Sequence, residues 1–167
     1  MSGVAEELIA RAAAAGITIA TAESCTGGMI AAALTDIAGS SAVVDRGFIT
    51  YSNAAKMQML GVTAETLQAT GAVSEETAAE MAAGALKAAG TTLAVSVTGI
   101  AGPGGSEFKP VGRVCFGLAR KGRNVMTETV EFGAPGRAEV RAAARDHALM
   151  LILQAVSQIE RELSTGA

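Results

Sequence analysis

The sequence predicts an α/β domain, a three-layer α/β/α sandwich with a mixed, mostly parallel sheet. Segments with helical periodicity alternate with short β-branched segments through the first two thirds of the chain, an order typical of parallel strands covered by helices. The nearly continuous apolar run at residues 93–98 fits a central strand covered on both faces better than an edge strand. Two later β-type segments, 114–120 and 125–132, predict an antiparallel hairpin, which makes the sheet mixed.

The first elements follow from local periodicity and from glycine positions. Residues 4–15 form a predicted helix because their apolar residues recur on one face and Gly16 follows them. The β-branched residues 17–22 predict the first strand, and a glycine turn leads into an Ala-rich helix from about residue 26 to residue 36. Residues 38–41 are expected to form a loop.

A second strand, residues 48–51, precedes three predicted helices, each introduced by a side chain that can accept a hydrogen bond from the first helical turn. These side chains are Asn53 before helix 54–60, Thr63 before helix 64–69, and Ser74 before a helix that runs to Ala89. After the central strand come a glycine-rich loop at 99–112, the hairpin, and a long helix from Pro135 to about Leu163. We find no repeat and no linker, so residues 1–167 are expected to form one domain.

Composition limits the partners and the compartment. Half of the residues are hydrophobic but only 3% are aromatic, so the core must be built mainly from aliphatic side chains. A net charge of −3 provides no basic surface for nucleic acid. No apolar run is long enough to span a membrane, and the first residues lack the charged and apolar regions of a signal peptide. We therefore expect a cytoplasmic protein with no nucleic-acid or membrane partner, and the many Ala and Met residues favour a homo-oligomer.

A single histidine narrows the chemistry. His147 lies in the predicted C-terminal helix with no nucleophile near it in sequence, so it is expected to be a structural or surface residue. A zinc site built from several histidines is excluded, and we expect neither a metal nor a cofactor. Cys25 and Cys115 are expected to be free thiols in a reducing compartment. A hydrolase with this composition would deprotonate its nucleophile with a group other than imidazole.

The most informative segment is residues 21–28, Thr-Ala-Glu-Ser-Cys-Thr-Gly-Gly, between the first strand and the next helix. Such a turn places backbone N–H groups at the helix start, where they suit an anion or a developing oxyanion. Ser24 or Cys25 would be its exposed nucleophile. Alternatively, Ser24 is only a helix N-cap. Cys25 is a rival nucleophile because a helix N-terminus would lower the pKa of its thiol. Otherwise Cys25 is a small buried hydrophobic residue. We favour Ser24 as the nucleophile because one cap does not require so many small polar neighbours.

Lys56 is the second candidate for chemistry. It closely follows the end of the second predicted strand, and open α/β sheets gather ligands at this edge. A partly desolvated lysine there would be neutral near pH 7 and would act as a general base towards Ser24; otherwise it is a solvated surface charge. Tyr51, the only tyrosine, would hydrogen-bond to this pair or simply pack at the strand end.

A second glycine-rich turn follows the central strand at residues 98–105. Its glycines permit close approach of the backbone to a phosphate, although it has neither Walker A nor Rossmann spacing and such loops are often only turns. Lys109, Arg137 and Arg141 are the cations that would complete an anion site, unless they are ordinary surface charges. We favour Arg141 because it projects from the start of the last helix.

These segments resemble the C-terminal domain family of the competence/damage-inducible protein CinA, whose stand-alone members are nicotinamide-nucleotide amidases. The likeness covers nearly the whole chain in order. The matching segments are 21–28, 36–41, 46–53 with Lys56, 71–74, 98–103 and 109–112. The resemblance implies the fold of that family and, in pyridine nucleotide salvage, hydrolysis of the carboxamide of nicotinamide mononucleotide to nicotinate mononucleotide and ammonia.

The resemblance also implies roles for individual residues, in a Ser/Lys mechanism without a metal. Ser24 would be the nucleophile, Lys56 the general base that later protonates the departing ammonia, and Tyr51 would support the pair. Backbone N–H groups at Cys25, Thr26 and Gly27 would hold the oxyanion. The expected substrate contacts come from Ser40, Ser41, Thr98, Gly99, Gly102 and Arg141.

Two other interpretations stay open. A non-catalytic nucleotide-binding module that regulates partners fits the same anion-binding loops, since CinA-like domains are also linked to competence and damage responses. In the second interpretation Cys25 is the nucleophile, and rapid inactivation by a thiol alkylator would favour it over Ser24.

Overall fold

The computed structural model describes residues 2–106 and 108–166. Residues 1, 107 and 167 lie outside the described residues. All three belong to the predicted domain, and residue 107 belongs to the predicted glycine-rich loop. The strands are β1 (Ile19–Glu23), β2 (Val44–Ile49), β3 (Leu93–Gly99), β4 (Arg113–Arg120) and β5 (Met126–Glu131). The helices are α1 (Ser2–Ala15), α2 (Met29–Thr35), α3 (Asn53–Leu60), α4 (Ala64–Thr70), α5 (Glu75–Ala89) and α6 (Arg137–Ser164), with a short 3₁₀-helix η1 (Ser40–Ala42) before β2.

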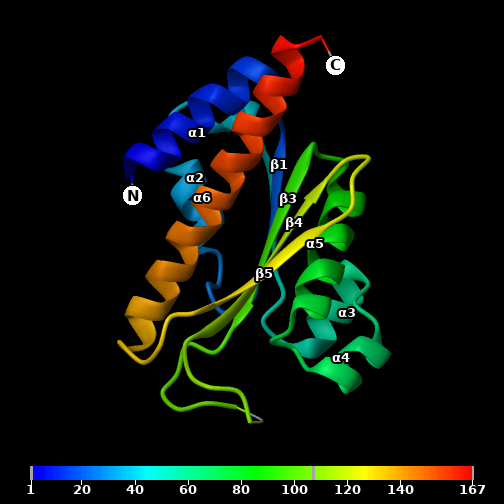
Figure 1. Cartoon of the computed structure of the whole chain (residues 1–167), viewed down its shortest axis with the longest axis vertical. Helices are drawn as coiled ribbons and strands as arrows, with labels where there is room; N and C mark the ends of the chain where they lie inside the picture. Colours follow the sequence, from blue (N-terminus) through cyan, green and yellow to red (C-terminus); the bar gives the residue numbers. More distant parts are fainter. Residues whose placement is uncertain (1, 107, 167) are drawn as a thin grey trace.

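Helices cover both faces of a five-stranded sheet with the order β2-β1-β3-β4-β5. Figure 1 shows α1, α2 and α6 together on one face, and α3, α4 and α5 on the other. β1 pairs in parallel with β2 and β3, whereas β4 pairs antiparallel with β3, and β5 antiparallel with β4. All strands except β4 therefore run in the same direction, and the predicted three-layer sandwich with a mixed, mostly parallel sheet is confirmed.

The central strands are buried, as their apolar sequences predict. Every residue of β1 and all of β3 except its last residue are buried. One face of the sheet packs on larger aliphatic side chains from α1, α2 and α6, and the other face packs on small residues of α5 such as Ala82. Gly84 lets α5 approach the end of α3, because a Cβ atom there would lie 1.9 Å from the carbonyl oxygen of Leu60. This close contact holds α3, and with it Lys56, against the rest of the domain.

Of the boundaries near the start of the chain that differ from the prediction, two bear on the site. The second strand spans residues 44–49 rather than 48–51, because its pairing with β1 ends at the last residue of both strands. Helix α2 begins at Met29 rather than near residue 26, because residues 24–28 form a turn. The turn therefore separates the predicted nucleophile from the start of the helix.

Polar side chains cap the helices that follow β2. Thr63 and Ser74 cap α4 and α5, as predicted. Helix α3 is capped by Ser52, whose Oγ accepts a hydrogen bond from the Ala55 N–H at 3.0 Å. The predicted cap, Asn53, is instead the first residue of the helix, so that prediction is wrong by one position.

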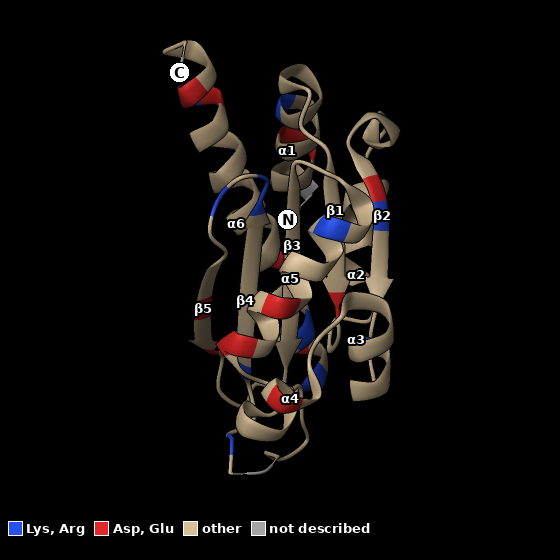
Figure 2. Cartoon of the chain, turned by 90° about the vertical axis from the view of Figure 1, so that its right-hand side faces the viewer, with Lys and Arg blue, Asp and Glu red and all other residues tan. Residues whose placement is uncertain are grey.

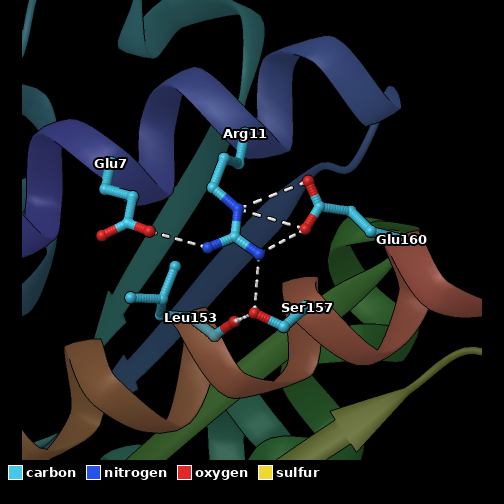
Figure 3. Close-up of polar contacts among 5 residues, drawn as sticks. All are labelled: Glu7, Arg11, Leu153, Ser157 and Glu160. Carbon is cyan, nitrogen blue, oxygen red and sulfur yellow. Dashed lines mark hydrogen bonds and ion pairs between the residues drawn. The ribbon is translucent and has the colours of Figure 1, made fainter.

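Arg11 joins the first and last helices (Figure 3). Its guanidinium donates hydrogen bonds to the Glu160 carboxylate and to Ser157 Oγ on α6, and to Glu7 one turn earlier on α1. Ser157 Oγ in turn donates to the carbonyl oxygen of Leu153 at 3.0 Å. Hydrogen bonding to Arg11 lowers the pKa of Glu160. The network ties together two helices that cover the same face of the sheet.

Charged residues are spread over the elements rather than collected into one basic face in the view of Figure 2. Within residues 2–106 and 108–166, no helix is both long and apolar enough to cross a membrane. In the same part of the chain, no group of three or more His, Cys, Asp and Glu side chains comes together as a metal site. Cys25 and Cys115 are buried free thiols.

Candidate active site

Ser24 lies directly after β1, at the carboxyl end of the parallel strands. Its N–H donates a hydrogen bond at 3.0 Å to the carbonyl oxygen of Val97 on β3, so the hydrogen bonding of the sheet extends one residue beyond β1. The residue is 8% exposed. The sheet thus holds the backbone of Ser24 rigidly while its side chain lies at the edge of the buried interior.

Lys56 reaches Ser24 from helix α3, 32 residues later in the chain. Its Nζ lies 3.1 Å from Ser24 Oγ and donates a second hydrogen bond, at 2.9 Å, to the carbonyl oxygen of Thr50. Thr50 is itself fixed to β1, since its N–H donates to the carbonyl oxygen of Glu23 at 2.8 Å. The structure brings together the two residues that the sequence predicts as nucleophile and base; their catalytic roles stay predictions.

Burial changes the chemistry of the Lys56 amine. The side chain is 1% exposed, and desolvation lowers its pKa below the ordinary value of 10.5. Removing an ammonium group from water is unfavourable, so burial favours the neutral amine. A neutral amine 3.1 Å from the Ser24 hydroxyl can accept the hydroxyl proton. The alternative of a solvated surface lysine is excluded by this burial.

The Cys25 thiol is in the opposite situation. It is buried, and desolvation raises its pKa to about 11. The sequence predicted a lowered thiol pKa at a helix N-terminus, and this prediction is wrong because α2 begins only at Met29. A protonated thiol is a poor nucleophile at neutral pH. The structure therefore favours Ser24 over Cys25 as the nucleophile.

The start of α2 is occupied by a carboxylate of the chain itself. Glu23 accepts hydrogen bonds from the N–H groups of Ile30 and Ala31, each at 3.0 Å, and from Gly28 N–H at 3.2 Å. The predicted role of this helix start as a site for a substrate anion or an oxyanion is therefore wrong, because the N–H groups already have an acceptor.

The turn itself retains two N–H groups without a main-chain acceptor among the described residues. Gly27 N–H donates to the carbonyl oxygen of Ser24 at 3.0 Å, so the predicted oxyanion role of Gly27 conflicts with its place in the turn. Among the described residues, the N–H groups of Cys25 and Thr26 donate to no carbonyl oxygen of the main chain. Cys25 also borders the cleft beside Ser24. These two groups stay the candidates for stabilising negative charge there.

A cleft of about 360 Å³ opens beside Ser24 and Lys56, outside the carboxyl ends of β1 and β3. The helix after β1 lies on one face of the sheet, and the helices that lead into β3 lie on the other (Figure 1). Open α/β folds bind ligands at such a switch point. The described part of the lining contains the guanidinium of Arg137, the buried amine of Lys56, and no Asp or Glu. This lining favours an anionic ligand.

The glycine-rich loop after β3 forms one wall of the cleft, and Thr98, Gly99 and Gly102 line it. Thr98 Oγ1 donates a hydrogen bond at 2.8 Å to the carbonyl oxygen of Ala72, so this hydroxyl braces the wall. Gly102 has a φ of 91°, which favours glycine, and its carbonyl oxygen accepts a hydrogen bond from Arg137. The predicted loop therefore reaches the site through its backbone more than through its side chains.

Arg137, rather than the favoured Arg141, is the arginine that lines the cleft. Arg141 donates hydrogen bonds to the carbonyl oxygens of Cys25 at 2.9 Å and Thr26 at 3.3 Å, so it braces the turn from behind. The sequence places both arginines one helical turn apart near the start of α6, and only their different contacts separate them. Lys109, the third predicted cation, donates to carbonyl oxygens of the chain and does not line this cleft.

Tyr51 lies at the mouth of the cleft and is 61% exposed. Its hydroxyl accepts a hydrogen bond at 2.9 Å from Arg137, which also donates to the carbonyl oxygen of Gly102 at 2.6 Å. Within the described residues Tyr51 has no hydrogen bond to Ser24 or Lys56, so the predicted direct support of that pair is not what the structure shows. Tyr51 and Arg137 instead form a hydrogen-bonded pair that lines the cleft.

Ser40 and Ser41 lie away from the cleft. They belong to η1, which precedes β2, and the first residue of β2 pairs with Ile19 at the start of β1. Ser24 follows the other end of β1, and a strand of five residues spans roughly 16 Å. Within one chain, Ser40 and Ser41 therefore lie too far from Ser24 to contact a ligand bound beside it, contrary to the expected substrate contacts.

The lone histidine does not line the cleft beside Ser24. His147 on α6 contacts the carboxylate of Glu128 on β5, and its ring lies 4.6 Å from that of Phe116, measured between centroids. Packing against an aromatic ring and pairing with a carboxylate are consistent with the structural role expected for this residue.

The fold and the site define an α/β protein with a buried serine–lysine pair at the carboxyl ends of its parallel strands, beside a cationic cleft. The chain belongs to the CinA C-terminal domain family, whose family model matches residues 1–156.

Known proteins of two lengths are similar to this chain. A nicotinamide-nucleotide amidohydrolase PncC from Enterobacter agglomerans is 54% identical over 149 residues, which cover 89% of this chain and 88% of that protein. A CinA-like protein from Chlorobium phaeobacteroides is 53% identical over 145 residues, which cover 84% of this chain but only 34% of that protein. The crystal structure of the competence/damage inducible protein CihA from Agrobacterium tumefaciens is 50% identical and superposes with a TM-score of 0.89, covering 93% of this chain and 94% of that one.

Proposed function

We propose that this chain hydrolyses the carboxamide of nicotinamide mononucleotide to nicotinate mononucleotide and ammonia, through Ser24 and Lys56. The observation that carries the proposal is the buried Lys56 Nζ, 3.1 Å from Ser24 Oγ at the edge of a cleft. The similarity to an amidohydrolase named for nicotinamide nucleotides, over most of both chains, supports the choice of substrate.

In the first half of the reaction, the neutral Lys56 amine takes the proton of Ser24 Oγ as this oxygen attacks the carboxamide carbon. The carbonyl oxygen becomes an oxyanion, which the N–H groups of Cys25 and Thr26 would stabilise. Lys56 then gives its proton to the departing nitrogen. The carbon–nitrogen bond breaks, ammonia leaves, and the substrate acyl group stays on Ser24 as an ester.

In the second half, Lys56 accepts a proton from a water molecule that attacks the ester carbonyl. The bond to Ser24 Oγ breaks, Lys56 returns the proton to this oxygen, and nicotinate mononucleotide leaves. The hydrogen bond from Nζ to the carbonyl oxygen of Thr50 keeps the amine aimed at the serine through both steps.

The cationic lining suits the phosphate of a mononucleotide. Arg137 lies at the mouth of the cleft, where exchange of its bonds to Tyr51 and Gly102 for bonds to a phosphate would fix the nucleotide. The exposed Tyr51 ring offers a face to the positively charged pyridinium ring of the substrate. We also propose a cytoplasmic location, one domain, and a homo-oligomeric assembly, with no metal or cofactor taking part in the reaction.

The proposal predicts that Ser24→Ala abolishes ammonia release from nicotinamide mononucleotide. Nucleotide binding, followed by calorimetry, is expected to stay within a few-fold of the wild type, because the hydroxyl acts in the reaction rather than in holding the phosphate. Iodoacetamide is expected to inactivate the wild type slowly, since the Cys25 thiol is buried and its pKa is about 11. Rapid inactivation would instead assign the nucleophile to Cys25.

A non-catalytic nucleotide-binding module is the second candidate, and the cleft lined by Arg137 fits it as well. Binding alone does not require a lysine buried against a serine, and this feature favours the hydrolase. If the wild type bound the mononucleotide but released no ammonia from any pyridine nucleotide, the binding module would be the better description.

A further inference from the structure

Glu23 is a buried ionisable residue that the mechanism above does not use. It is the last residue of β1 and is 0% exposed. One carboxylate oxygen, Oε1, accepts hydrogen bonds from Thr26 Oγ1 at 2.6 Å and from the N–H groups of Gly28 and Ile30. The other, Oε2, accepts from Ala31 N–H at 3.0 Å. All of these donors lie in the turn after Ser24 or in the first turn of α2.

This arrangement compensates the cost of burying a carboxylate. A buried charge is unfavourable unless it is paired or hydrogen-bonded. Within the described residues no Lys, Arg or His forms an ion pair with Glu23; its partners are the hydroxyl of Thr26 and three backbone N–H groups at the positive end of a helix. The carboxylate therefore depends on this turn geometry, and the turn geometry depends on the carboxylate.

Glu23 is connected to both halves of the serine–lysine pair. Its side chain closes the turn that begins at Ser24. Its carbonyl oxygen accepts the N–H of Thr50, whose own carbonyl oxygen accepts the hydrogen bond from Lys56 Nζ. A shift at residue 23 would thus move the hydroxyl and the amine relative to each other, and also the N–H groups of Cys25 and Thr26.

We infer that Glu23 is a positioning residue for the reaction: its buried carboxylate holds the turn 24–28 so that the Ser24 hydroxyl and the neighbouring N–H groups face the carboxamide and Lys56. The inference rests on the proposed function. Glu23 touches neither the substrate nor the reacting atoms, and it acts through the position of Ser24.

Glu23→Gln is the test, because it keeps the shape of the side chain but replaces one accepting oxygen with an amide that donates. That amide would face an N–H group of the turn or the helix. We expect kcat for ammonia release to fall about 100-fold, as a displacement of about 1 Å at a reacting atom does, with KM within about threefold of the wild type.

Glu80→Gln is the matched control. Glu80 on α5 also accepts hydrogen bonds from a backbone N–H and a threonine hydroxyl, those of Thr63 and Thr66 at the start of α4, but it does not line the cleft. This variant is expected to keep kcat within about twofold. A similar loss of kcat in both variants would overturn the inference, since the loss would then reflect general loosening of the fold.

Unchanged kcat in folded Glu23→Gln, or a rise in KM alone, would also overturn the inference. If Glu23→Gln does not fold, Thr26→Val decides, because it removes only the hydroxyl that donates to Glu23. We expect it to lower kcat about tenfold, and unchanged kcat there would overturn the inference.

A fluorophosphonate that labels activated serines separates this inference from the proposed function. We expect wild-type Ser24 to be labelled, and Glu23→Gln to be labelled at least tenfold more slowly. If the wild type is labelled but releases no ammonia, the proposed substrate is wrong, and the labelling rates still decide the role of Glu23. If wild-type Ser24 is not labelled, both the serine mechanism and the positioning role are overturned.

Discussion

Burial of Lys56 has a consequence for folding as well as for catalysis. Its pKa is lower in the folded chain than in the unfolded chain, so between these two values the unfolded chain binds more protons. The free energy of unfolding therefore rises with pH through this window, up to about 10.5. At neutral pH the folded protein therefore carries the free-energy cost of burying this amine away from water.

Lys56→Met should separate these two effects. We expect kcat to fall by about 10²–10⁴-fold, with a smaller change in KM, because a general base acts in the transition state. The melting temperature of the variant should exceed that of the wild type at pH 7, and the difference should shrink as the pH approaches 10.5.

The pH profile of the wild type provides an independent check on Lys56. Because the neutral amine is the active form, kcat/KM should rise with pH through a pKa below 10.5. Activity that falls over this range, or an unchanged kcat in Lys56→Met, would remove Lys56 from the role of base.

At the scale of the element, helix α6 presents two arginines with different tasks. Arg137, in its first turn, faces the mouth of the cleft, whereas Arg141, one turn later, holds the carbonyl oxygens of Cys25 and Thr26. One helix end can thereby serve the ligand and support the turn after Ser24.

Arg137→Ala is expected to raise KM for nicotinamide mononucleotide about tenfold or more, the size of a lost hydrogen bond to a charged group. It should scarcely affect the dephosphorylated riboside, whereas Arg141→Ala should mainly lower kcat for both substrates. Arg145→Ala, which removes an arginine paired with Asp146 elsewhere on α6, is the matched control. Equal effects of Arg137→Ala on both substrates would contradict a phosphate role.

The pairing of α1 with α6 should depend on pH through Glu160. Hydrogen bonding to Arg11 lowers the pKa of Glu160 in the folded chain, so its contribution to stability is present above about pH 4.5 and is lost as the pH falls through the lowered value. Glu160→Gln should therefore lower the melting temperature at pH 7 but match the wild type in strong acid.

Glu6→Gln, which changes an exposed carboxylate on α1, serves as the control for Glu160. It should leave the melting temperature unchanged across the same range. A difference between Glu160→Gln and the wild type that persists below the lowered pKa would show that Arg11 stabilises the helix pair in another way.

At the scale of the whole molecule, strand order creates the cleft. β1 lies between β2 and β3 and runs parallel to both, so the residues after all three strands meet at one edge of the sheet. Ser24, Lys56 and the loop after β3 converge there although they are far apart in sequence. The antiparallel hairpin then returns the chain towards α6, which begins at the same edge with Arg137.

Much of the fold could be predicted because its signals are local. β-Branched and apolar runs predict β1 and β3, and Thr63 and Ser74 cap their helices. The positions of Ser24 and Lys56 after predicted strands already pointed to the carboxyl ends of the sheet. Boundaries at turns were less predictable, since Ser52 and Asn53 are equally good caps and only the backbone conformation chooses between them.

By itself, the sequence determined the α/β architecture, the helix caps of α4 and α5, and Ser24 and Lys56 as candidates for one site, because periodicity, capping and position after a strand are read over a few residues. Only the tertiary structure decided that Glu23 occupies the start of α2, that Arg137 lines the cleft in place of Arg141, and that Ser40 lies at the opposite end of the strands. These contacts depend on strand order, pairing register and the reach of each side chain, which no local pattern encodes.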